Sequence, residues 1–254
     1  LSAQFVAQDK GRLTIAATHN QASYVLPPVL LRFAQEFPDV EVEIRQGTPR
    51  YVSDMLLRGE ADIGLATQAL DEVSDLSTFP CFDWDHVVIV PDGHPLTRLS
   101  APTLADIAAF PLITYSRDFA GGSAVVDAFA AAGLKPDLRL TAMDADVIKT
   151  YVRLGMGVGI VAQMAVINGH GEGLKVLPQS NRLFPRSSTK VALLKGSLLR
   201  NYAYSLMQML APHVPQKVLT GARPMPPLAG NLACFAERAD LHFDWGAGPR
   251  SVAA

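Results

Sequence analysis

The sequence predicts an α/β protein of two lobes with mixed, mainly parallel sheets, and three observations support this fold class. Strand patterns alternate with helical patterns over residues 12–66, an order that implies right-handed crossovers and a parallel sheet. The same alternation restarts after the turn-forming segment 91–95, which is the expected crossing into a second lobe. A strand over 190–194 and a helix over 199–210 would return the chain to the first lobe, so that two crossings form a hinge.

Residue spacing defines the elements of the first lobe. Val29, Phe33 and Phe37 recur every four residues on one helix face, and residues 40–44 alternate apolar and charged side chains with period two. Gly59 is typical of a helix C-cap. The elements expected here are strands over 12–17, 40–44, 61–66, 79–82 and 86–90, and helices over 22–37 and 50–58.

The second lobe repeats this alternation. Thr103 and Asp144 precede helical patterns as N-cap residues do. The glycine-rich segment 155–159 follows a helix and enters a strand, the reverse of the order in a dinucleotide-binding loop, so we interpret it as a tight turn. Lys149 and Arg153 lie four residues apart and are expected to face solvent or a partner subunit. The remaining expected elements are strands over 111–115, 138–142 and 158–161 and helices over 123–132 and 145–154.

Composition excludes several classes of function. The 254 residues are 49% hydrophobic and 18% charged, which is ample for packed cores, and a net charge of −2 provides no bulk attraction to nucleic acid. No apolar run approaches the roughly 20 residues of a membrane helix, and no signal peptide opens the sequence, so we expect a cytoplasmic protein. The two cysteines and six histidines lack metal-ligand spacing. We expect no metal, no cofactor and, without a paired acid, base or nucleophile, no enzymatic activity.

The segment 18–21, Thr-His-Asn-Gln, joins an apolar strand to a helix with no carboxylate nearby. Uncharged hydroxyl and amide groups at the carboxyl end of a buried strand, beside a helix N-terminus, suit a small anion. Thr67 closes the third strand and would lie beside Thr18. Asn20 is suited to cap the helix as well, and His19 is expected to point away or to pack at the rim. The pattern predicts a sensor for a small polar ligand.

The string from Ile15 to Pro27 resembles the effector-binding domain of LysR-type transcriptional regulators, in the CysB-like branch that governs sulfur assimilation and cysteine biosynthesis. Three further blocks agree, at 46–49, 59–67 and 141–153, and the last agrees nearly residue for residue. The resemblance covers roughly residues 10–212. It implies two α/β lobes like those of type 2 periplasmic binding proteins, with the effector in the cleft between them.

The resemblance also implies an effector site. The family carries Thr where this chain has Asn20 and Ala120, so affinity or effector identity is expected to differ. Trp84 matches a family tryptophan that would shelter the cleft or pack between the lobes, and Thr48 fits either the site or an ordinary turn. The effector-binding residues expected on this basis are Thr18, Asn20, Gln21, Thr48, Thr67, Trp84, Ala120 and Gly121.

The implied partners are a small effector, further copies of the chain, and DNA. The effector would be N-acetylserine, O-acetylserine, sulfate or thiosulfate. A homodimer or homotetramer is expected, with Leu30, Phe37 and helix 123–132 as the surfaces to check, and promoter DNA would be bound only by a winged helix-turn-helix outside this chain. The alternative is a periplasmic solute-binding receptor for sulfate or an amino acid, which would be monomeric.

These interpretations divide the chain into four parts. Residues 1–10 would be a linker, residues 11–91 with 190–212 the first lobe, and residues 92–189 the second lobe. From 213 to 254 the sequence is rich in Pro, Gly and Ala without a clear period, so we expect a weakly ordered tail there.

Overall fold

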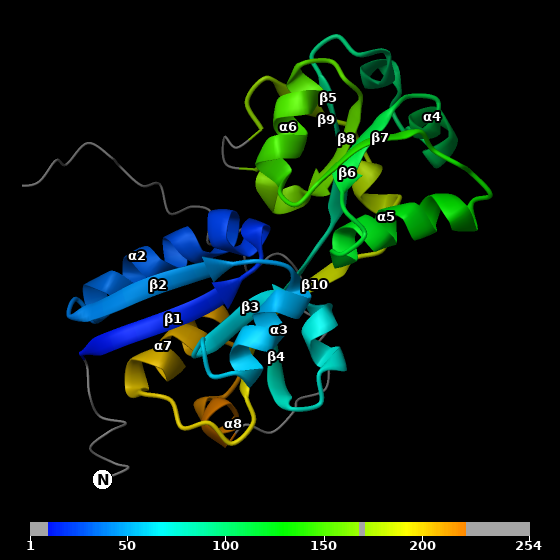
Figure 1. The fold of residues 1–254 in the computed structure, drawn as a ribbon. Helices are drawn as coiled ribbons and strands as arrows, with labels where there is room; N and C mark the ends of the chain where they lie inside the picture. Colours follow the sequence, from blue (N-terminus) through cyan, green and yellow to red (C-terminus); the bar gives the residue numbers. More distant parts are fainter. Residues whose placement is uncertain (1–9, 168–170, 222–254) are drawn as a thin grey trace, which may run out of the picture.

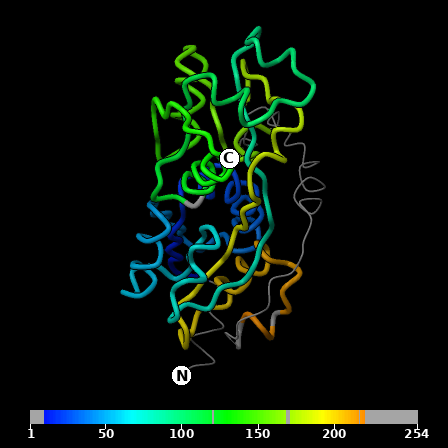
Figure 2. The backbone as a smooth tube through the Cα atoms, turned by 90° about the vertical axis from the view of Figure 1, so that its right-hand side faces the viewer, coloured from blue at the N-terminus to red at the C-terminus, as the bar shows by residue number. Residues whose placement is uncertain are grey.

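The computed structural model describes residues 10–167 and 171–221, which form two lobes, each built on a five-stranded sheet. Figure 1 shows one lobe above the other, each with helices packed against its sheet. In Figure 2 two extended segments of the chain pass between the lobes side by side. The expected α/β class and two-lobe architecture are therefore confirmed.

The first lobe contains a mixed sheet. Its strands are β1 (Gly11–Ala17), β2 (Val40–Gln46), β3 (Ile63–Thr67), β4 (Leu76–Trp84) and β10 (Ser187–Leu194). They lie in the order β2-β1-β3-β10-β4. The strands β2, β1 and β3 are parallel, as the strand–helix–strand order predicts, and β10 runs antiparallel between β3 and β4.

The second lobe repeats this design. Its strands are β5 (His86–Pro91), β6 (Leu112–Tyr115), β7 (Leu138–Ala142), β8 (Val158–Ala162) and β9 (Leu174–Val176). In the order β7-β6-β8-β5-β9, β6 is parallel to both neighbours and β5 is antiparallel to both of its own.

Two helices begin where their predicted capping residues place them, after Thr103 and Asp144. Each of these side chains, and that of Thr48 before another helix, accepts a hydrogen bond from a backbone N–H in the first turn, which satisfies a group that has no intrahelical partner. The α-helices are α2 (Leu26–Glu36), α3 (Pro49–Leu57), α4 (Leu104–Ala108), α5 (Ala120–Ala131), α6 (Ala145–Arg153), α7 (Asn201–Leu210) and α8 (Gln216–Gly221). No helix among the described residues is both long enough and apolar enough to span a membrane.

The chain crosses between the lobes at Asp85, and the expected crossing at 91–95 is wrong. Strand β5, placed in the first lobe by the sequence, belongs to the second sheet. No glycine or proline separates β4 from β5, so the strong turn signal at 91–95 marks a turn inside the second lobe. The return crossing lies at Arg186, whose Nε lies 3.1 Å from Asp85 Oδ1. An ion pair therefore joins the two crossing segments.

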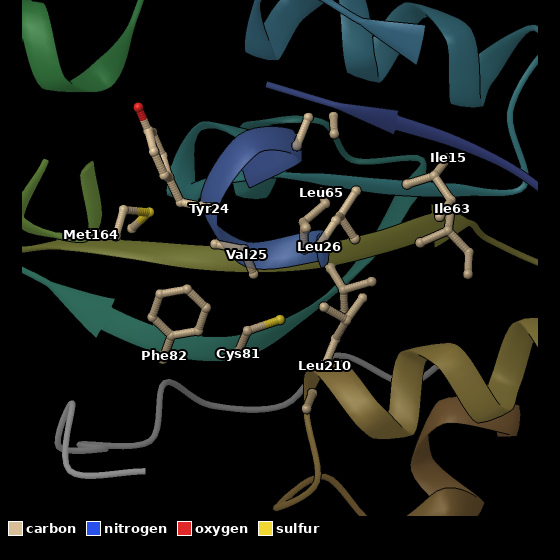
Figure 3. Close-up of a cluster of buried hydrophobic side chains, with 14 of the residues drawn as sticks. Ile15, Tyr24, Val25, Leu26, Ile63, Leu65, Cys81, Phe82, Met164 and Leu210 are labelled. Atoms are coloured by element: carbon tan, nitrogen blue, oxygen red, sulfur yellow. The ribbon is translucent and has the colours of Figure 1, made fainter. Parts of the chain in front are cut away.

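One buried apolar cluster continues from the first lobe into the second. It includes Leu26 and Leu65 of the first lobe together with Tyr115 and Met164 of the second. Figure 3 shows the part of this cluster around η1 (Gln21–Val25), where Met164 approaches Tyr24. The two lobes are thus packed against each other in this structure.

Two expectations about the periphery are wrong. The tail begins later than residue 213, because Val214 and Leu219 are fully buried and α8 packs on α7; residues 222–254 lie outside the described part of the chain. Phe37 is also buried, with its ring 6.4 Å from that of Tyr202, so it offers no surface to a partner.

Lys149 does not face solvent. Only 3% of its surface is exposed, and its Nζ lies 2.9 Å from Asp146 Oδ1 and donates to Tyr24 Oη and to the carbonyl of Ala165. Because α6 packs at the boundary of the lobes, its buried face carries this ammonium group to partners on other elements. Arg153 is exposed as expected.

Candidate functional site

The carboxyl ends of β1 and β3 bring Thr18 and Thr67 together. These parallel strands are neighbours in the sheet, so they end at the same edge. Thr67 is the last residue of β3, and Thr18 follows β1 directly and donates its backbone N–H to Leu65 O at 3.1 Å. Both threonines are buried. They therefore lie together where ligands bind in open α/β sheets.

A small cavity lies at this edge, between the lobes. Its volume is about 20 Å³, room for roughly one water molecule. From the first lobe, the cavity is lined by the segment after β1 and by the ends of β3 and β4. From the second lobe, it is lined by the end of β6, the segment after β7 and the start of α5. The lining residues are Thr18, His19, Asn20, Gln21, Thr67, Trp84, Tyr115, Phe119, Gly121 and Met143.

Buried polar atoms without partners gather around the cavity. Asn20 Oδ1, Thr67 Oγ1 and Trp84 Nε1 are buried and make no hydrogen bond to any described residue. An unpaired buried polar group costs about 1–3 kcal/mol, so native proteins rarely keep several together. A polar ligand would supply the missing partners.

Two amides project into the cavity from the segment after β1. Gln21 is 1% exposed, and its Oε1 accepts a hydrogen bond from Thr189 Oγ1 at 3.3 Å, which leaves its Nε2 donors for a ligand. Asn20 Nδ2 donates to Tyr115 Oη at 2.9 Å. Asn20 makes no side-chain cap to the helix that follows, so the capping role suggested by the sequence is wrong. The helix begins instead with the π-helical turn η1.

The described lining of the cavity contains no Asp or Glu, whose carboxylate would repel an anion, and no Lys or Arg. The start of α5 adds partial positive charge. Phe119 is its N-cap and makes no side-chain cap, while the backbone N–H groups of a first helical turn lack intrahelical partners and attract anions. Gly121, in that turn, lines the cavity. The electrostatics suit a compact anion held by neutral donors.

His86 lies beside two residues that line the cavity, Trp84 and Gly121. It is fully buried, its ring lies 4.9 Å from that of Trp84, and a Cβ at Gly121 would lie 2.8 Å from its Nε2. Burial lowers the pKa of His86 to about 4. The imidazole is therefore neutral at neutral pH and adds no charge to the site.

Six of the eight expected site residues line the cavity, and two are not among its lining residues. Thr48 does not line the cavity; its Oγ1 accepts from Tyr51 N at 3.2 Å and caps α3. Ala120 begins α5, and its side chain lies outside the described set. The expected residues that line one cavity are Thr18, Asn20, Gln21, Thr67, Trp84 and Gly121.

Sequence reasoning missed several members of the site. His19 lines the cavity, so it does not point away from it. Tyr115 ends a parallel strand just as Thr67 does, so the rule that identified Thr67 would also have found Tyr115. Phe119, Met143 and Thr189 carry no comparable signal. No described group of three or more His, Cys, Asp or Glu residues is arranged to hold a metal ion.

Fold and cavity together define a two-lobed α/β domain with a small polar cavity between its lobes. The LysR substrate binding domain family matches residues 7–215. The chain therefore belongs to this family, whose members are transcriptional regulators and not enzymes. LysR-type regulators bind small-molecule effectors and act on promoter DNA as oligomers.

The relatives are regulators of one branch. The chain is 50% identical over 218 residues to the HTH-type transcriptional regulator SsuR of Burkholderia cenocepacia, covering 86% of this chain and 70% of that protein. It is 45% identical to the regulator CysB of the same species, covering 86% of this chain and 69% of that protein. The solved cofactor-binding domain of the Cbl transcriptional regulator superposes with a TM-score of 0.79 at 42% identity, covering 84% of this chain and 93% of that domain.

Proposed function

We propose that this chain is the effector-sensing domain of a LysR-type regulator of sulfur assimilation and cysteine biosynthesis. The observation that carries this proposal is the set of buried, unpaired polar atoms on Asn20, Thr67 and Trp84 around one interlobe cavity. The similarity to SsuR, CysB and Cbl supports the sulfur branch.

The chemistry of the cavity favours a compact oxyanion. Hydroxyl, amide and indole groups can donate to several oxygens at once, and no lining carboxylate opposes a negative charge. Sulfate and thiosulfate fit this description. A cavity of about 20 Å³, which holds about one water molecule, would have to widen for each of the four candidates. The widening is smallest for sulfate and thiosulfate and larger for N-acetylserine and O-acetylserine. The two tetrahedral anions are therefore the first ligands to test.

The ligand would act by shifting the packing of the lobes. It can favour one arrangement only through its different affinity for the two arrangements. We propose that this shift reaches a winged helix-turn-helix outside this chain, which binds promoter DNA, in a cytoplasmic homodimer or homotetramer. A periplasmic receptor for sulfate or an amino acid would share the fold, but the relatives named above are all transcriptional regulators.

Calorimetric titration of the purified chain with each of the four ligands tests the proposal. We expect at least one to bind, and Thr18→Ala and Thr67→Ala each to weaken it about tenfold or more, because each hydroxyl would donate to a charged ligand. Thr48→Ala is the matched control, since Thr48 caps α3 away from the cavity. Unchanged affinity in both cavity variants would contradict the proposed site.

A further inference from the structure

We propose that Tyr115 is a positioning residue that sets the direction of the Asn20 side-chain amide, so that Asn20 presents its N–H donors to a bound oxyanion. The inference rests on the proposed function and adds to it a residue from the opposite lobe. Asn20 comes from the segment after β1 and Tyr115 from the end of β6. The hydrogen bond between them therefore joins the two lobes at the cavity itself.

The hydrogen bonds of Tyr115 to described residues leave its own proton without an acceptor. Its Oη accepts from Asn20 Nδ2 at 2.9 Å and from the backbone N–H of Ala162 at 3.0 Å. Tyr115 is buried, and burial raises the pKa of its hydroxyl far above the usual value. The hydroxyl therefore stays protonated and has a hydrogen to donate. Asn20 Oδ1, on the same amide, is a buried acceptor that has no partner in the part of the chain that the structure describes.

A half-turn of the Asn20 amide would pair the Tyr115 proton with Asn20 Oδ1 and release Asn20 Nδ2 from Tyr115. Tyr115 would then donate its O–H to Asn20 Oδ1 while still accepting from Ala162, and the two N–H donors of Asn20 Nδ2 would face the cavity. Such a chain of hydrogen bonds polarises each member and strengthens the last donor. An oxyanion favours this orientation because it accepts hydrogen bonds and cannot donate one to Oδ1.

The arrangement makes one ligand contact depend on the closeness of the lobes. If the lobes separate, Tyr115 moves away with β6 and no longer fixes the amide of Asn20. An amide that is free to rotate must be ordered when the ligand binds, which lowers affinity. The Tyr115–Asn20 pair would thus give the packed arrangement of the lobes a higher affinity for the anion than a separated one, as an effector switch requires.

A double-mutant cycle measured by calorimetric titration with sulfate tests this role. We expect Tyr115→Phe to weaken sulfate binding about tenfold in the parent chain but less than about twofold in an Asn20→Ala background. Equal losses in both backgrounds would overturn the proposal, because they would show that Tyr115 contacts the ligand by itself. Tyr24→Phe is the matched control, since it removes another hydroxyl that bridges the lobes outside the cavity.

The NMR signals of the Asn20 side-chain amide test the pair without ligand. Tyr115→Phe should shift these signals in the ligand-free chain, and Tyr24→Phe should leave them in place. Unmoved signals in Tyr115→Phe would overturn the pair even if sulfate binds. Conversely, a parent chain that binds none of the four ligands would overturn the proposed function and the anion role of Asn20, while the NMR signals would still report on the hydrogen bond to Tyr115.

Discussion

The hydroxyl of Tyr24 in the first lobe donates a hydrogen bond to Asp146 Oδ1 in the second lobe at 2.8 Å. The ammonium of Lys149 lies beside them, 3.1 Å from Tyr24 Oη and 5.1 Å from the centre of the Tyr24 ring. These contacts form a polar connection between the lobes that does not involve the cavity lining. Polar contacts therefore join the lobes here as well as beside the cavity, where Asn20 donates to Tyr115.

Removing the Tyr24 hydroxyl should destabilise the chain. We expect Tyr24→Phe to lower the free energy of unfolding by about 1–2 kcal/mol, because the buried ammonium of Lys149 loses one acceptor and keeps Asp146 and the carbonyl of Ala165. Urea denaturation followed by circular dichroism measures this. Tyr51→Phe, at a side chain that is 44% exposed, should change the free energy little. An equally small effect of both substitutions would show that the Tyr24 contact contributes nothing.

Removing the Thr67 hydroxyl should make the folded chain more stable and its ligand binding weaker. Thr67 Oγ1 is buried and has no partner among the residues described, so Thr67→Val should raise the free energy of unfolding by about 1 kcal/mol while it weakens sulfate binding. Thr114 is the matched control, because its buried hydroxyl donates to Ile160 O at 3.1 Å. Thr114→Val should lower stability by a similar amount. Thermal denaturation of both variants distinguishes them, and destabilisation by Thr67→Val would mean that its hydroxyl is already satisfied.

The buried His86 should make stability depend on pH. Its pKa is lowered to about 4 in the folded chain by burial, against an ordinary value of 6.5, although the neighbouring Asp85 acts in the opposite direction. The unfolded chain therefore takes up a proton near pH 6.5 that the folded chain accepts only near pH 4. The free energy of unfolding should fall as pH drops through this window, by about 2 kcal/mol between pH 7.5 and pH 5 from this group.

Urea denaturation at these two pH values checks the expectation. The drop should be smaller in His86→Leu than in the parent chain by about the same amount, and His213→Gln, at an exposed position, should retain the full drop. NMR titration of the His86 ring gives the pKa directly if the leucine variant folds poorly. A His86 pKa near 6.5 in the folded chain would contradict the account.

Residue patterns predicted most of the fold because most segments form, in the whole structure, the strand or helix that their own residue pattern favours. The alternation over 12–66 was sufficient for a parallel arrangement of β1, β2 and β3. The crossing at Asp85 was not predictable in the same way, since strand patterns continue on both sides of it. Lys149 was misplaced because helical spacing identifies a face, whereas packing of the second lobe against the first decides what covers that face.

The site was partly predictable for a geometric reason. Thr18 and Thr67 end neighbouring parallel strands, so their proximity follows from sheet topology. Trp84 was identified only through the resemblance to a family. Thr189 reaches the site on β10, an antiparallel strand that enters between β3 and β4 from far along the chain. No short-range pattern indicates that insertion.

If the cavity between the lobes holds a compact oxyanion on neutral donors, selenate, an anomalously scattering analogue of sulfate, should bind there in a crystal of the chain. We expect one strong anomalous peak within hydrogen-bonding distance of Thr18 and Thr67, with Gln21 as a further donor. A crystal with no peak between the lobes at saturating selenate, or with its only strong peak elsewhere, would contradict this expectation.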